Sequence, residues 1–84
     1  MSDSLLTDAN QLLKQGKLEE AIATYQKAIQ QNPQFAWSHH YLGEALAKVG
    51  RFEEAIAALR QALAISPQSP WSLYKLGVIF GPAR

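Results

Sequence analysis

The chain has 84 residues, and its eight basic and seven acidic side chains leave a formal net charge of +1. This balance argues against binding to nucleic acid or to an anionic membrane, and the lack of cysteine excludes disulfides and thiolate metal sites. Because we find neither a secretory signal pattern nor a long apolar run, we expect a cytoplasmic protein, or the cytoplasmic part of one.

The chain repeats itself at an offset of 34 residues. The recurring residues are Gly16 and Gly50, the segments 19–23 and 53–57 that both read EEAIA, Pro33 and Pro67, and Trp37-Ser38 and Trp71-Ser72. A period of this size is typical of a solenoid, in which each unit buries its apolar face against the next unit. We therefore predict one domain over residues 1–84, built from stacked repeats.

The two complete repeats, residues 2–35 and 36–69, each predict a pair of helices. Gly16 and Gly50 are suited to the left-handed conformation that ends the leading helix. A pair of glutamates opens the second helix, where negative charge suits the helix dipole, and a proline ends it. Small residues let the helices approach closely. These small residues are Ala21, Ala28, Ala55 and Ala62.

Residues 70–81 predict half of a third repeat. Pro70 suits the first position of a helix, Ser69 suits the cap before it, and Gly81 with Pro82 ends it. Because no partner helix follows in the chain, the apolar side chains of this terminal helix cannot all be covered. They are Leu73, Leu76, Ile79 and Phe80. We expect this surface to support self-association into a homo-oligomer, or to pack on a further segment of a longer chain. The alternative is a terminal cap that leaves a few apolar atoms exposed to water.

The second repeat resembles the tetratricopeptide repeat (TPR) family. The residues at the family's characteristic positions are Leu42, Gly43, Leu46, Gly50, Phe52, Ala55, Leu59, Ala62 and Pro67. The resemblance covers nearly the whole chain. It implies an all-α, right-handed superhelical solenoid of helix–turn–helix repeats, here with five helices. His39 stands where the family usually has tryptophan, and Asp8 stands where it has an interior leucine.

The resemblance also implies that the leading helix of each repeat lines a concave groove that binds a peptide or protein partner. In the second repeat we assign Tyr41, Leu42, Ala45 and Val49 to the core, and the neighbouring face to the groove. This face comprises Asp3, Leu6, Asn10, Leu13 and Lys14 in the first repeat, then Trp37, His40, Glu44, Ala47 and Lys48, then Trp71, Tyr74 and Val78. All of these except Asp3, Leu13 and Ala47 are expected to contact the partner.

Two features of this expected groove bear on its partner. Trp37 and Trp71 either anchor a partner or pack over the preceding turn, and the sequence leaves both alternatives open. Some TPR domains clamp the terminal carboxylate of a chaperone, but at the matching positions only Asn10 and Lys75 suit that role. We therefore expect an apolar or mixed peptide or helix as partner.

The sequence gives no indication of catalysis, of a cofactor or of a metal site. His39 and His40 are adjacent on one helix and point in different directions, so they cannot chelate one ion together. No serine–histidine–aspartate or cysteine–histidine arrangement and no glycine-rich phosphate loop is found. We expect a non-catalytic interaction module. There are two alternatives. Self-assembly is its main activity, or the chain is the docking region of a larger enzyme.

Overall fold

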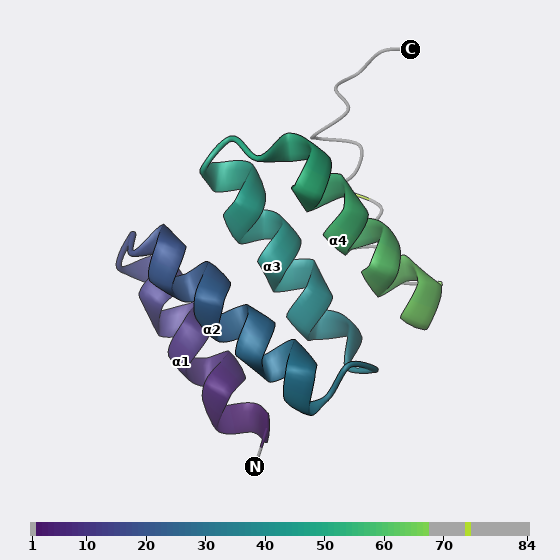
Figure 1. Ribbon diagram of the computed structural model, residues 1–84, viewed down its shortest axis with the longest axis horizontal. Helices are drawn as coiled ribbons and strands as arrows, with labels where there is room; N and C mark the ends of the chain where they lie inside the picture. The colour runs from purple at the N-terminus through teal and green to yellow at the C-terminus, as the bar shows by residue number, and fades with distance from the viewer. Residues whose placement is uncertain (1, 68–73, 75–84) are drawn as a thin grey trace.

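The computed structural model describes residues 2–67 and Tyr74, and the described part of the chain is all helical. Its helices are α1 Ser2–Lys14, α2 Leu18–Gln31, α3 Ala36–Lys48 and α4 Phe52–Ile65. Helix α1 packs along α2 and α3 packs along α4, while α2 and α3 join the two hairpins (Figure 1). These are the helices predicted from the two complete repeats. The expected fifth helix and half repeat, residues 70–81, fall outside the described residues except for Tyr74.

Both leading helices end in the same way, as the sequence predicts. Gly16 and Gly50 have φ angles of 80° and 86°, in the left-handed region that favours glycine. The residue after each glycine donates its N–H to the carbonyl oxygen five residues back, which is Leu12 in α1 and Leu46 in α3, each at 2.9 Å. These bonds satisfy carbonyl groups that the end of a helix leaves without a partner.

The second helix of each repeat also has the predicted limits. Helices α2 and α4 begin with glutamate pairs in their first turns, and they end two residues before Pro33 and Pro67. Proline lacks an N–H and disfavours helical geometry in the residue before it, which explains why neither helix continues. The prolines therefore fix where each repeat turns into the next.

Small side chains hold the helices close together. The predicted alanines are all buried, with exposed fractions of 0% for Ala21, Ala55 and Ala62 and 2% for Ala28. The approach is tightest where α3 crosses α4. A Cβ atom on Gly43 would lie 2.8 Å from Leu59 Cγ and 3.1 Å from the carbonyl oxygen of Ala55. Any side chain at position 43 would therefore push these two helices apart.

We expect Gly43→Ala to lower the free energy of unfolding by about 1 kcal/mol. Overpacking costs about 1–3 kcal/mol, whereas the better helix propensity of alanine returns at most about 1 kcal/mol. Urea unfolding followed by circular dichroism measures the change. The exposed Gln61 of α4 gives a matched control, because Gln61→Ala should be about 1 kcal/mol more stable than Gln61→Gly. A higher urea midpoint for Gly43→Ala would contradict the close approach.

Candidate functional site

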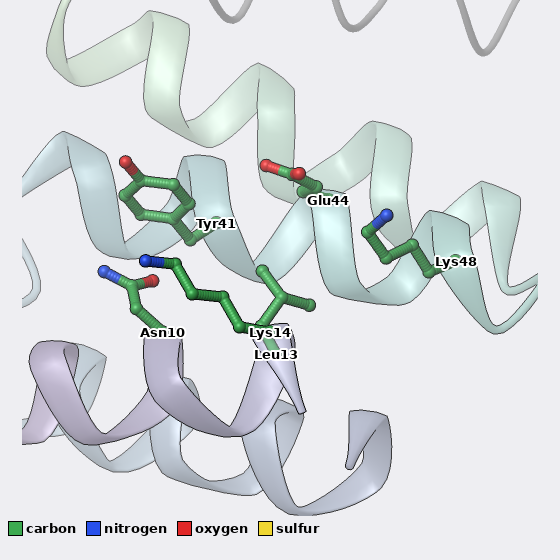
Figure 2. A pocket seen from close by; sticks show the side chains of 6 residues that line it. All are labelled: Asn10, Leu13, Lys14, Tyr41, Glu44 and Lys48. Carbon is green, nitrogen blue, oxygen red and sulfur yellow. The ribbon is translucent and has the colours of Figure 1, made fainter. Parts of the chain in front are cut away.

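An open pocket of about 490 Å³ lies between the leading helices α1 and α3. It is lined by Asn10, Leu13 and Lys14 from α1 and by Tyr41, Glu44 and Lys48 from α3 (Figure 2). The two helices make few contacts with each other, because each packs mainly on the second helix of its own repeat. Their side chains therefore face one another across a space instead of interlocking. A volume of this size is within the range of ligand-binding clefts.

The repeat supplies this pocket with equivalent pairs of side chains. Asn10 and Glu44 are 34 residues apart, and so are Lys14 and Lys48. Because the leading helices lie in phase, both members of each pair reach the same space (Figure 2). The structure thus brings together these four residues, which the sequence assigns to the groove, along with Leu13 of the same face of α1.

Tyr41 differs from the sequence prediction, which places it in the core. It is half-buried, and one part of it packs against the core while another lines the pocket. Its ring stacks on the fully buried Tyr25, with centroids 6.1 Å apart and planes at 12°. A tyrosine can bury its ring and still present its hydroxyl to an open space. Tyr41 therefore belongs to the wall between the core and the pocket.

A hydrogen bond ties the other wall to the core. The hydroxyl of Tyr25 on α2 donates to Oδ1 of Asn10 on α1. Burial raises the pKa of Tyr25 well above its ordinary value, and the nearby Glu44 carboxylate raises it further. The hydroxyl therefore keeps its proton near neutral pH and remains a donor. This bond fixes the orientation of Asn10 within the pocket.

Trp37 extends the wall of α3 beyond the pocket. Its ring stacks on Tyr41 at a centroid distance of 5.6 Å, and 38% of the residue is exposed. His40, which the sequence places in the groove, is only 5% exposed. Its ring lies edge-on to both Trp37 and Tyr41, at 5.3 Å from each. His40 is therefore a support behind the aromatic wall and does not line the pocket.

His39 binds the turn that precedes α3. Nε2 of the buried His39 donates to the carbonyl oxygen of Pro33 at 3.0 Å. Since a carbonyl group can only accept, the proton of this bond must be on Nε2. Packing of Trp37 over the same turn, one of its two alternatives, stays a prediction. Whether Trp37 contacts a partner remains a prediction.

The structure places only some of the other residues expected in the groove or on the self-association surface. Leu6 is half-buried against the core and is not among the residues that line the pocket. Tyr74 is 66% exposed. The rest lie outside the described residues, so their roles remain predictions. They are Trp71 and Val78 of the expected groove and Leu73, Leu76, Ile79 and Phe80 of the expected self-association surface.

Within residues 2–67 and at Tyr74, no cluster of three or more histidine, cysteine, aspartate or glutamate side chains is placed to hold a metal ion. In the same part of the chain, none of the helices has the length and apolar character needed to span a membrane.

Two in-phase helical hairpins with a groove between their leading helices suggest a helical repeat family. A family model described as a TPR repeat matches residues 9–50 and again residues 45–81. The chain belongs to the TPR family. The crystal structure of a tetratricopeptide repeat domain protein from Salinibacter ruber is similar, with a TM-score of 0.77 over 93% of this chain and 89% of that chain. Its sequence identity of 18% makes this a likeness of fold. Among curated protein sequences, none matches the TPR chain significantly.

The bond between Tyr25 and Asn10 predicts unequal effects of removing its two partners. Asn10→Ala leaves the buried hydroxyl without an acceptor, which should cost about 1–3 kcal/mol of unfolding free energy. Tyr25→Phe leaves only the half-buried amide unpaired and should cost about 1 kcal/mol. Urea unfolding of both variants and of the double variant measures the coupling, with Gln11→Ala on the exposed face of α1 as control. Additive losses would show that the two groups do not interact.

The raised pKa of Tyr25 predicts a loss of stability in alkali. Below about pH 10, tyrosine is protonated in both the folded and the unfolded chain. Above that pH the unfolded chain releases the proton while the folded chain keeps it. The contribution of Tyr25 to stability is therefore complete below about pH 10 and falls by up to about 1.4 kcal/mol per pH unit above it.

Comparison with Tyr25→Phe isolates this effect, because the other titrating groups are common to both chains. The difference in unfolding free energy between the two chains should shrink between about pH 9.5 and pH 11. Urea titrations at several pH values in this range measure it. A difference that stays constant with pH would mean that Tyr25 ionises alike in both states.

Proposed function

We propose that this TPR chain is a non-catalytic interaction module that binds a peptide segment of a partner protein between α1 and α3. TPR repeats generally mediate protein–protein interaction. The observation that carries the proposal is the convergence of side chains from both leading helices on one open pocket. A partner lying there would contact both repeats at once.

The lining favours a segment of protein over a small charged metabolite. It combines an aliphatic side chain, an aromatic ring, an amide and charges of both signs (Figure 2). Apolar surface beside a few polar groups is typical of surfaces that recognise mixed side chains.

We extend the proposal to the remainder of the molecule. Residues 70–81 would add the fifth helix of a right-handed superhelix and continue the groove with Trp71, Tyr74 and Val78. The compartment in which we expect this module to act is the cytoplasm. The exposed position of Tyr74 is compatible with a groove residue.

Peptide selection followed by NMR tests this proposal. A random peptide library is selected against the full chain, and the best peptide is titrated into ¹⁵N-labelled protein. We expect the largest amide shifts at Asn10, Leu13, Tyr41, Glu44 and Lys48, because a peptide in the pocket changes their surroundings.

The exposed faces of the second helices provide the control for this experiment. Lys27 on α2 and Gln61 on α4 are exposed and do not line the pocket. Their amide signals should stay within the shifts caused by an unrelated peptide. Shifts centred on these residues, or a failure of every selected peptide to shift the lining, would refute binding in the groove.

A further inference from the structure

One face of α3 runs from an exposed aromatic ring to a lysine. Trp37, Tyr41, Glu44 and Lys48 follow steps of four, three and four residues, which place them along one side of a helix. The last three line the pocket, and Trp37 joins them through its stacking on Tyr41. This line of four residues, which we call the α3 stripe, has an aromatic end and a cationic end.

The aromatic end is preorganised to receive another ring. Trp37 stacks on Tyr41 with the planes at 28° and meets the edge of His40 at 79°. These neighbours hold the indole in place, although 38% of the residue remains exposed. A ring that is already held loses little side-chain entropy on binding. An aromatic or large apolar side chain of a partner can therefore pack on Trp37 at low cost.

The cationic end of the stripe is Lys48, and Lys14 of the other repeat reaches the same pocket from α1. Lys14 and Lys48 lie in the last turns of α1 and α3, and both are exposed. In Figure 2 the amine of Lys14 turns back along α1 toward Asn10 and Tyr41, and that of Lys48 leans toward Glu44. Two cations and one anion line the pocket. This excess of positive charge favours an acidic side chain in the partner.

We propose that the α3 stripe selects an extended peptide segment with an aromatic and an acidic side chain, the aromatic one on Trp37 and the acidic one beside Lys48. This inference rests on the proposed function. Residues 37 and 48 are separated by roughly 16 Å along the helix axis. An extended segment covers that length in about five residues. Side chains of an extended segment alternate between two sides. The aromatic and the acidic side chain therefore both face the groove only when they stand at positions i and i+4, or i and i+6.

Blocked synthetic peptides test this selection on the full chain. Fluorescein-labelled, N-acetylated and C-amidated peptides carry one phenylalanine and one glutamate in an alanine–serine background, in both chain orders. The separations tested are two, three, four, five, six and eight residues. Fluorescence anisotropy should show the tightest binding at four or six residues. Replacing the glutamate by lysine should weaken binding about two- to fivefold, the usual range for an exposed ion pair.

Charge reversal in the protein provides the decisive comparison. Lys48→Glu should reverse the preference, so that the phenylalanine–lysine peptide binds more tightly than the phenylalanine–glutamate peptide. Lys27→Glu makes the same change on the exposed face of α2 and should leave the preference intact. Trp37→Ala should weaken both peptides equally, and circular dichroism checks that each variant is folded. Raising the salt to 1 M should reduce the preference for glutamate.

Each failure identifies the idea at fault. If selected peptides shift the pocket residues but glutamate and lysine peptides bind alike, or Lys48→Glu leaves the preference unchanged, the inference is wrong and the proposed function stands. If the same peptides bind tightly only when they are made with a free C-terminal carboxylate in place of the amide, the acidic side chain is not the ligand and the inference is overturned. If no peptide shifts the pocket residues, the proposed function fails together with the inference.

Discussion

The close contact of helices within each hairpin is the constraint on which the groove depends. At Gly43 there is no room for a side chain between α3 and α4, and the alanines of α2 and α4 that recur between the repeats are buried. Each leading helix is thus held tightly by the second helix of its own repeat. Because α2 packs against both α1 and α3, these two leading helices have few contacts with each other. The pocket is the space between α1 and α3, because each of these helices packs mainly on the second helix of its own repeat.

The walls of the pocket are connected to the core by polar and aromatic contacts. Tyr25, which is fully buried, holds Asn10 through its hydroxyl and stacks on Tyr41 through its ring. Tyr41 in turn carries Trp37. One buried side chain therefore positions both sides of the groove. Preorganisation of this kind reduces the side-chain conformational entropy that is lost when a partner binds.

In the TPR chain, equivalent positions of the two repeats carry the same side chain at some places in the pocket and different side chains at others. Lys14 and Lys48 repeat the same charge in successive units, whereas Asn10 and Glu44 differ at one repeat position. The two leading helices that form the groove therefore repeat, while the charge of the side chains that line it differs between them. His39, at the position where the family usually has tryptophan, binds the turn at Pro33. Trp37 stacks on Tyr41 and extends the wall of α3.

The sequence alone determined the four described helices, the points at which glycine and proline end them, and the family. Glycines in the left-handed conformation and prolines end helices through local backbone geometry, and these effects act wherever the residues occur. The repeat also showed which residues share a face, so Asn10, Lys14, Glu44 and Lys48 were assigned together before their positions were known.

Only the tertiary structure decided which of the residues at the edge of that face are buried. Tyr41 lies on the wall of the pocket, His40 is covered by two aromatic rings, and Leu6 packs against the core. Helical spacing gives the direction of a side chain but not the distance to the neighbouring helix. At the border between core and groove, that distance and the size of the adjoining rings decide burial, and both arise from how the hairpins pack.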